Sequence, residues 1–276
     1  MSSERTVGLV IPAYDKQKTP FERGLLHEIL DNVPSQVNPR IYVVVNNATS
    51  GFRNYMNKLA ERESWLRVIH LPNPSSFGLA YLRGYQAALN DSVELAVEID
   101  GNGSHKPSYL PGIIEPIIDG SVDGVYTTRF SHGGGVDRYP LQRKLISLVG
   151  TVVGNALLLG TGVGWVSDLT SGLQGFSARS LSDLFSVSPP DQFVSVWWGP
   201  GYAVQGELRV KFLWRGNRVL MIPMIWGSDR VDPPQGLPMR VPLRALLGQL
   251  LILRERGRIA NSVNKKSRIV YQSAKK

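Results

Sequence analysis

The chain contains no cysteine and only four histidines among its 276 residues. The absence of cysteine excludes a disulfide framework, a zinc–thiolate site and a cysteine nucleophile. With so few histidines, a histidine-built metal centre is not expected. The glycine-rich phosphate loops GxGxxG and GxxxxGK[ST] are missing as well. A nucleotide bound by this chain would therefore have its diphosphate held by a metal ion and arginine rather than by a glycine cradle.

Long hydrophobic runs are also scarce. The amino-terminal stretch MSSERTVGLVIPAY has a short apolar core and no small-residue cleavage site, which predicts a first strand rather than a signal peptide. The most apolar later segment, Leu145 to Val166, is long enough to be considered as a membrane span. It carries five glycines and Asn155, and no second span accompanies it. We therefore prefer an interfacial or buried helix for this segment.

Acidic residues are almost absent from the carboxyl-terminal part. Residues Arg240 to Lys276 hold 10 of the 31 Lys and Arg residues but only one of the 22 acids, Glu255, which leaves 21 of each sign elsewhere. The net charge of +9 therefore lies in the last 37 residues. A basic tail binds nucleic acid or an anionic membrane surface. Because this tail follows the arginine-flanked apolar segment Val241 to Arg256, we expect an interfacial helix at an anionic membrane and no nucleic acid. A core-packing helix with a solvated tail is the alternative.

Short apolar runs alternate with segments of helical spacing over the first hundred residues. This alternation predicts a parallel sheet covered by helices on both faces. The strands are expected at Thr6 to Ile11, Ile41 to Val45, Leu66 to Leu71 and Val93 to Ile99, and the helices at Phe21 to Asn32, Phe52 to Arg62 and Phe77 to Leu89.

Polar residues follow three of these strands at their carboxyl ends. Tyr14 comes after the first strand, Asn47 after the second and Asp100 after the fourth. In a parallel sheet those ends share one edge, so the three side chains are expected to converge. Tyr14 is suited to stack on a base, Asn47 to pair with a base edge, and Asp100 to hold a metal ion.

The stretch VEIDGNGSHKP, from Val97 to Pro107, predicts the metal site. Asp100, Asn102 and Ser104 offer hard oxygen ligands, which suit Mg²⁺ or Mn²⁺ better than a soft metal. A divalent ion that keeps several waters and bridges two phosphates needs only one or two protein carboxylates. The alternative is a strand followed by an ordinary turn rich in Asp, Asn and Gly.

Eight short stretches along the chain occur in a fixed order, and that order carries more weight than any one of them. They resemble the motifs of glycosyltransferase family 2 and, within it, the dolichyl-phosphate mannose synthase group, from about Val7 to Arg230. The stretches are VIPAYDK (10–16), VVVNNATSG (43–51), NPSSFGLAYLRGYQAAL (73–89), DGNGSHKP (100–107), TRFSHGGGVDRYPLQRKLIS (128–147), DLTSGLQGFS (168–177), GYAVQGE (201–207) and SDR (228–230).

The resemblance implies an A-type glycosyltransferase fold, a Rossmann-like, mostly parallel α/β sheet with helices on both faces. It implies a catalytic domain over residues 1–239, with a nucleotide-sugar half at about 1–127 and an acceptor half at about 128–239. An amphipathic helix and basic tail would follow at 240–276. The implied reaction is an inverting, metal-assisted transfer of a hexose from a GDP- or UDP-linked sugar to a polyprenyl or dolichyl phosphate.

Matching the motifs residue by residue gives an expected site. The metal would be held by Asp100, Asn102 and Ser104, and Arg230 would stabilise the leaving diphosphate. Asp100, Asp168 and Arg230 are the expected catalytic residues. The expected nucleotide-sugar residues are Pro12, Tyr14, Asn47, Gly78, Asp100, Gly101, Asn102 and Arg230.

The acceptor decides which chemistry is needed. The resemblance places a lipid phosphate against Arg129, Arg143 and Ser147, and arginine donates bidentate hydrogen bonds to phosphate. A phosphomonoester is already largely ionised at neutral pH, so it needs positioning cations rather than a base. If the acceptor were a hydroxyl group, a general base would be required, with Asp168 first and Glu207 second among the choices.

Three departures from the family pattern remove negative charge beside the expected diphosphate. Asn102 replaces the second metal aspartate, Asn46 and Asn47 replace an aspartate pair, and Lys16 replaces a glutamate. An asparagine carbonyl oxygen still coordinates a hard cation, but the site should hold metal more weakly.

Three hypotheses follow for the activity. The first is a cytoplasmic transferase, peripherally bound to an anionic membrane surface, that makes a polyprenyl-phosphate sugar. The second is a soluble family 2 transferase that glycosylates a protein or glycan hydroxyl group. The third is a non-catalytic nucleotide-sugar-binding protein, which the three asparagines at acidic positions motivate.

Overall fold

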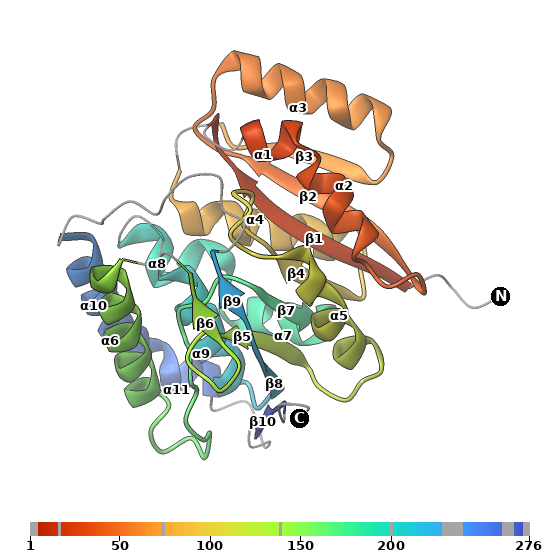
Figure 1. Cartoon of the computed structure of the whole chain (residues 1–276). Coiled ribbons are helices and arrows are strands. Elements are labelled where there is room, and N and C mark those ends of the chain that lie inside the picture. Colours follow the sequence, from red (N-terminus) through yellow and green to blue (C-terminus); the bar gives the residue numbers. More distant parts are fainter. Residues whose placement is uncertain are drawn as a thin grey trace.

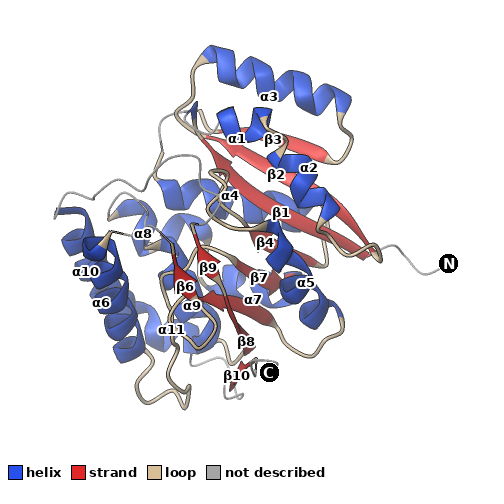
Figure 2. Cartoon of the chain, in the orientation of Figure 1, coloured by secondary structure: helices blue, strands red, loops and turns tan. Residues whose placement is uncertain are grey.

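The computed structural model describes residues 5–15, 18–72, 75–137, 140–198, 201, 203–227, 240–260 and 268–272. Within these ranges the strands form one eight-stranded sheet, in the order β10-β8-β5-β7-β4-β1-β2-β3, and one two-stranded sheet of β6 and β9 (Figures 1 and 2). Only β7 runs antiparallel to its neighbours β4 and β5 among the described pairings. The predicted mostly parallel sheet is confirmed.

The longest strands of the large sheet, β1 and β2, lie side by side next to the edge strand β3. The first two strands run in register over nine residues. The large sheet consists of β1 (Arg5–Ala13), β2 (Val37–Val45), β3 (Leu66–His70), β4 (Leu95–Glu98), β5 (Gly124–Thr128), β7 (Gln174–Ser177), β8 (Arg218–Pro223) and β10 (Arg268–Tyr271), and the small sheet of β6 (Gly135–Val136) and β9 (Ile225–Trp226).

Helices cover both faces of the large sheet, as predicted (Figure 1). Short 3₁₀ turns at Pro107–Tyr109, Pro190–Gln192 and Leu253–Glu255 complete the described elements. The helices are α1 (Lys18–Glu22), α2 (Leu25–Asp31), α3 (Ser50–Arg62), α4 (Phe77–Asn90), α5 (Leu110–Ile118), α6 (Leu141–Leu157), α7 (Ala178–Val187), α8 (Val194–Trp197), α9 (Val204–Trp214), α10 (Arg240–Ile252) and α11 (Arg256–Ala260).

Two hydrophobic cores lie on opposite sides of the sheet. Successive side chains of a strand point to opposite faces, so Leu9 and Ile11 join the core under α2, α3 and α5. Val10 joins the other core, under α4, α7 and α9. Because both faces are covered, the strands read as continuous apolar runs rather than as alternating ones.

Polar caps start the helices that leave the carboxyl edge of the sheet. The hydroxyl of Thr49 accepts a hydrogen bond from the Phe52 N–H at the start of α3, and that of Ser76 accepts one from Leu79 at the start of α4. Serine and threonine are favoured at this position because their oxygens satisfy an otherwise unpaired N–H. These caps fix where the loops after β2 and β3 end.

The carboxyl-terminal segment differs from a free appendage. A helix, α10, does occupy the segment expected to be helical, and it packs against α6 and α8. Farther along, β10 pairs in parallel with β8 at the edge of the large sheet. Part of the expected basic tail is therefore a strand of the main fold. No described helix is both long and apolar enough to cross a membrane.

Candidate active site

Asp100 lies directly beyond β4, beside the carboxyl end of β1. Its Oδ1 accepts a hydrogen bond from the Tyr81 hydroxyl at 2.5 Å, and its Oδ2 accepts one from the Ser104 hydroxyl at 2.9 Å. The Asp100 side chain is still 19% exposed. Its carboxylate is thus held in one orientation while part of it faces solvent, as a residue that contacts a bound ion or ligand must be.

His105 braces the same turn. Its Nδ1 accepts a hydrogen bond from the Asp100 backbone N–H at 3.1 Å, so a neutral ring carries its proton on Nε2, which lies 3.8 Å from the Asp100 carboxylate. Burial lowers the pKa of His105 and favours that neutral ring. The side chain is 1% exposed, which suits a structural role for His105 rather than a ligand role.

The oxygen donors of this turn fit a metal that arrives with a diphosphate. Asp100 supplies one carboxylate, and Asn102 supplies an amide oxygen that also accepts the Ser104 N–H at 2.9 Å. Ser104 is 1% exposed and its hydroxyl donates to Asp100, so the structure does not support the expectation that Ser104 is a third ligand. Among the described residues no three His, Cys, Asp or Glu side chains form a metal-binding group. Such a site suits Mg²⁺ or Mn²⁺ bridged to substrate phosphates, because these ions need few protein carboxylates.

The asparagine pair after β2 divides into a structural and an exposed residue. Asn46 is fully buried, and its amide exchanges two hydrogen bonds with the Ser75 backbone, at 2.9 and 3.0 Å. Asn47 is exposed and has a left-handed backbone, with φ of 46°. The ring of Tyr14 stacks on Phe77 at 6.2 Å. Asn47 and Tyr14 are therefore the residues here that remain suited to contact a base.

Two expected nucleotide-binding glycines turn out to be packing contacts. A Cβ atom at Gly78 would lie 2.9 Å from the Cβ of Val204 and 3.0 Å from the carbonyl oxygen of Gly201. Gly78 thus allows the start of α4 to touch the segment before α9, and its contact with a nucleotide sugar stays a prediction. A Cβ at Gly101 would lie 3.0 Å from the carbonyl oxygen of Pro12. Gly101 and Pro12 therefore let the ends of β4 and β1 approach each other.

The turn from Asp168 to Leu173 holds a buried ion pair. Asp168 is 0% and Arg129 is 5% exposed. The Arg129 Nε donates to Oδ2 of Asp168 at 2.8 Å, and its second guanidinium nitrogen donates to Oδ1 at 3.0 Å. Asp168 also accepts the backbone N–H groups of Arg129 and Thr170 and the Thr170 hydroxyl, at 2.9 to 3.1 Å. Burial alone would raise the pKa of Asp168, but the charge and hydrogen bonds of Arg129 outweigh it and lower that pKa.

This ion pair contradicts the expectation that Asp168 serves as a general base. A base must reach the proton that it removes, whereas Asp168 is sealed from solvent and accepts five hydrogen bonds. Glu207, the second choice, is also 0% exposed and caps α8 by accepting the N–H groups of Val194 and Ser195 at 2.8 and 2.7 Å. Both carboxylates instead fix parts of the fold.

The same turn joins the metal end of the site to α6. A Cβ at Gly172 would lie 3.6 Å from the Asp100 carboxylate. The Thr170 hydroxyl accepts a hydrogen bond from Arg129 at 2.6 Å, and the Thr170 methyl group lies 3.1 Å from where a Gly150 Cβ would stand on α6. The Asp168–Leu173 turn therefore lies between Asp100, Arg129 and the helix that carries Arg143 and Ser147.

Arg143 and Ser147 stand one turn apart on α6, so they share a helix face. Ser147 is 6% exposed. The Nε of Arg143 is buried and has no hydrogen-bond partner among the described residues. A buried N–H without a partner costs free energy, and a bound anion would remove that cost.

A buried arginine beneath the turn was not expected from the sequence. Arg209 is fully buried and donates to the Gln174 side chain at 2.6 Å and to the carbonyl oxygen of Asp168 at 2.6 Å. Burial raises the pKa of nearby Glu98 to about 8, so Glu98 is mostly neutral at pH 7. Arg129 and Arg209 then interact with the carboxylate of Asp168, and the carboxylate of Asp100 lies close enough to act on the same cluster of groups.

A model of the family described as "Glycosyl transferase family 2" matches residues 9–185. That span is more than half of the chain. It includes the carboxyl-terminal part of β1, the Asp100 turn, the Arg129–Asp168 pair and α6. The chain belongs to glycosyltransferase family 2.

Named relatives in this family transfer mannose to lipid phosphates. The undecaprenyl-phosphate mannosyltransferase of Micrococcus luteus is 26% identical over 218 residues, which cover 78% of this chain and 81% of that protein. The polyprenol monophosphomannose synthase of Mycolicibacterium smegmatis is 26% identical over 224 residues, covering 80% of this chain and 77% of that one.

Solved structures share the family 2 fold at lower identity. Glucosyl-3-phosphoglycerate synthase from Mycobacterium tuberculosis, in complex with Mn²⁺ and UDP, superposes with a TM-score of 0.59 at 17% identity, covering 91% of this chain and 80% of that one. Mannosyl-3-phosphoglycerate synthase from Rubrobacter xylanophilus gives 0.58 at 16% identity, covering 95% and 76%. These likenesses confirm the A-type glycosyltransferase fold.

The expected site residue Arg230 lies outside the described ranges, and so does Lys16, one of the departures from the family pattern. Arg209 was not predicted from the sequence, because α9 is buried on all sides and shows no amphipathic period. Tyr81 and Tyr85, whose hydroxyls donate to Asp100 and Glu98, were not predicted either. Their four-residue spacing on an expected helix was a usable signal, because it places both on one face.

Proposed function

We propose that this glycosyltransferase moves a hexose, with inversion, from a nucleotide sugar to a polyprenyl phosphate. The observation that carries the proposal is that both carboxylates suited to deprotonate a hydroxyl acceptor, Asp168 and Glu207, are fully buried and hydrogen-bonded. A phosphate acceptor is already ionised at neutral pH and needs no base. The names of the two bacterial relatives agree with this acceptor class.

The acceptor phosphate would bind between Arg129 and α6. Asp168 holds the Arg129 guanidinium in one plane by two parallel hydrogen bonds, and the Arg143 Nε on α6 lacks a partner among the described residues. The guanidinium groups of Arg129 and Arg143 would supply charge-assisted hydrogen bonds to an anion at this place. Arginines fixed beforehand lose little freedom when they bind phosphate.

The donor would occupy the carboxyl edge of β1, β2 and β4. Asn47 and Tyr14 would contact the base, and Asp100 and Asn102 would hold Mg²⁺ or Mn²⁺. When bound, such an ion neutralises charge on the leaving diphosphate. Arg230, which lies outside the described residues, is proposed for the same task. GDP-mannose is the first donor to test, because both relatives carry names of mannose-transferring enzymes.

The transfer itself is a single displacement. A phosphate oxygen of the acceptor attacks the anomeric carbon, a new C–O bond forms, and the bond from that carbon to the β-phosphate oxygen breaks. The electron pair leaves with the nucleoside diphosphate, and no proton has to move. Arg129 and Arg143 would orient the attacking oxygen in line, and orientation of this kind lowers the barrier by several kcal/mol.

We also propose that α6 and α10 rest on a membrane. The two helices lie side by side in Figure 1 and contact each other. Both expose apolar side chains, with exposed fractions between 37% for Leu148 and 71% for Leu141. We call this set the leucine face: Leu141, Leu145, Leu148, Val149 and Val152 of α6, and Leu243, Leu247 and Leu250 of α10.

Apolar patches of this kind mark interaction sites. The exposed Lys144 on α6 and Arg244 on α10 stand among the residues of the leucine face, so anionic lipids would add electrostatic attraction. Binding to anionic vesicles should weaken as salt is added, while neutral vesicles bind less. Vesicle co-sedimentation checks this, and equal binding to neutral and anionic vesicles would contradict the electrostatic part.

The test of the activity is incubation of the protein with GDP-mannose or UDP-glucose, Mn²⁺ and a short polyprenyl phosphate, with the matching prenol as control. A glycolipid product should form from the phosphate and not from the prenol. Arg143→Gln should raise the acceptor KM about tenfold or more, because one charge-assisted hydrogen bond is lost. Arg179→Gln, at an exposed position on α7, should leave KM unchanged. Product from the prenol, or from neither compound with any donor, would refute the proposal.

A further inference from the structure

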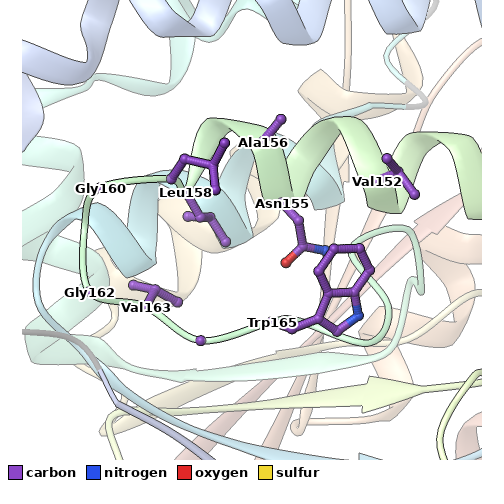
Figure 3. Close-up of a pocket in the computed structure, with 10 residues that line it drawn as sticks. Val152, Asn155, Ala156, Leu158, Gly160, Gly162, Val163 and Trp165 are labelled. Atoms are coloured by element: carbon purple, nitrogen blue, oxygen red, sulfur yellow. The ribbon is translucent and has the colours of Figure 1, made fainter.

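A pocket opens at the carboxyl end of α6 (Figure 3). It has a volume of about 490 Å³. One wall is the last two turns of the helix, and the other is the loop that follows it. The lining consists mostly of aliphatic side chains, glycines and one tryptophan, including Val152, Asn155, Ala156, Leu159, Val163 and Trp165.

The one amide among these residues is already satisfied by the protein. The Asn155 Nδ2 donates to the carbonyl oxygens of Thr151 and Val166, both at 2.9 Å, and its Oδ1 accepts the Val166 N–H at 2.8 Å. Both N–H groups of the Asn155 amide and one lone pair of its oxygen are therefore already used by the protein. A pocket with such a lining suits a hydrocarbon rather than a polar molecule.

The loop wall is held in place from two sides. Asn155 fixes it at Val166, and the hydroxyl of Tyr271 on β10 donates to the Trp165 carbonyl oxygen at 2.5 Å and accepts the Ser167 N–H at 3.2 Å. The pocket thus exists before any ligand arrives. A preformed pocket spends little free energy on ordering when it binds.

The pocket continues the leucine face. Leu141, Leu145, Leu148 and Val152 recur every three or four residues and so share one side of α6, and Val152 also lines the pocket. Ser147, Thr151 and Asn155 form the neighbouring stripe, four residues apart. The path from Ser147 to Asn155 covers two helical turns, or about 12 Å.

We propose that this pocket binds the isoprenoid chain of the acceptor, a few units away from its phosphate. This rests on the proposed acceptor site at Arg129, Arg143 and Ser147. Each isoprene unit adds four chain bonds, roughly 4–5 Å when extended, so two or three units bridge the distance from Ser147. A cavity of about 150 Å³ holds one benzene molecule, and the 490 Å³ pocket therefore has room for roughly three five-carbon units.

A pocket at this distance from the phosphate site would make kcat/KM depend on the length of the acceptor chain. Acceptors of two units would bind through the phosphate alone, while those of four or five units would also fill the pocket. Burying a hydrocarbon unit is favourable by an amount that scales with its area. We expect kcat/KM to rise about tenfold or more between two and four isoprene units, and to level off beyond about six.

A filling substitution tests the pocket. Ala156 lies on the exposed side of α6 and lines the pocket, so Ala156→Phe should occupy it without disturbing the core. The variant should lose the advantage of the four-unit acceptor and keep kcat/KM for the two-unit acceptor within about twofold. Asn54→Phe is the control, at an exposed position on α3 that belongs neither to the pocket nor to the leucine face. It should retain the dependence on chain length.

The outcomes separate the two proposals. If no acceptor phosphate of any length is glycosylated, the proposed function fails. If the two-unit acceptor is glycosylated but chain length has no effect, or if Ala156→Phe keeps the full effect, the pocket proposal alone is wrong.

Binding without turnover supplies a second measurement. Trp165 is 59% exposed and lines the pocket, so its fluorescence should shift to the blue with a four-unit prenyl phosphate and not with a one-unit phosphate. Trp165→Phe should abolish the shift. If phosphatidylcholine vesicles block the shift completely, the pocket holds bulk membrane lipid instead, and the assignment to the acceptor chain is overturned.

Discussion

Replacing Asp168 with Asn separates a positioning role from a general-base role. The substitution preserves the shape of the side chain but removes the charge that faces Arg129 at 2.8 Å. Arg129 is 5% exposed, so it would be left as a buried cation without its partner. Breaking a buried ion pair on one side destabilises a protein by about 3–5 kcal/mol. We expect Asp168→Asn to lower the free energy of unfolding by about that amount.

The kinetic consequence follows from what Asp168 holds. If it orients Arg129, the variant should raise the KM for the acceptor phosphate about tenfold to a hundredfold, with a much smaller change in kcat. The pH dependence of kcat should stay the same, because no proton is transferred. A lost general base would instead lower kcat by about 10²- to 10⁴-fold and remove a limb of the pH profile.

A double variant guards against simple unfolding. Arg129→Met together with Asp168→Leu removes both charges, and replacing a buried ion pair by apolar residues of similar volume is often nearly neutral for stability. The double variant should therefore regain most of the lost stability, yet remain poor at binding the acceptor. Chemical denaturation and steady-state kinetics with varied acceptor measure both quantities. An Asp168→Asn variant with unchanged acceptor KM and a collapsed kcat would refute the positioning role.

Three further predictions concern other parts of the structure. Burial raises the pKa of Glu98 from 4.5 to about 8, so the native state holds a proton that the unfolded state releases. The free energy of unfolding should therefore fall as pH rises from about 5 to 8, by at most about 5 kcal/mol. In denaturation experiments across that pH range, Glu98→Gln should flatten the pH dependence of stability, whereas the control Glu115→Gln, at an exposed position on α5, should not. If wild type and Glu98→Gln showed the same pH dependence of stability, Glu98 would not be the titrating group. Asn102→Asp should tighten the Mn²⁺-dependent binding of nucleoside diphosphate about tenfold, and Asp100→Asn should nearly abolish it, because carboxylate ligands bind hard cations more strongly than amides. Calorimetry measures this affinity, and an unchanged value in both variants would argue against a metal at this turn. Glu255→Gln should destabilise the protein by about 1–3 kcal/mol and speed proteolysis after α9, because Lys211 is fully buried and lies 3.0 Å from Glu255. An unaltered midpoint of thermal unfolding would show that the contact between Lys211 and Glu255 contributes little.

The sheet was predictable because its signal is local. Continuous apolar runs such as Ile41 to Val45 are typical of strands covered on both faces, and they ended in the residues that the structure places at one edge. The strands that were not anticipated are short or late. β7 is antiparallel and four residues long, and β10 pairs with β8 across some fifty residues of sequence, so neither leaves a periodic pattern to follow.

The site was predictable only as far as residue type implies chemistry. Motif order and charge selected Asp100, which the structure places at the carboxyl edge of the sheet, and Arg143 and Ser147, whose role in binding the acceptor stays a prediction. Asp168 was assigned as a base because a carboxylate near a reaction centre can act as one, and the sequence does not reveal whether its oxygens are occupied. Whether Asp168 can act as a general base or only positions another residue is set by its burial and by its ion pair with Arg129, which lies 39 positions away in the sequence.

The proposed donor site and the proposed acceptor site differ in how firmly the protein fixes their charged groups. Under the proposed function, Asn46, Asn47 and Asn102 would lie beside the donor, and Asn46 braces a loop there by two backbone hydrogen bonds. On the proposed acceptor side Arg129, Asp168 and Arg209 are all at most 5% exposed. Buried charges that are paired and hydrogen-bonded change position little, while a donor site with fewer fixed charges depends more on its metal. Discrimination between acceptors is therefore expected to be built into the fold, and discrimination between donors to vary with the ion that accompanies them.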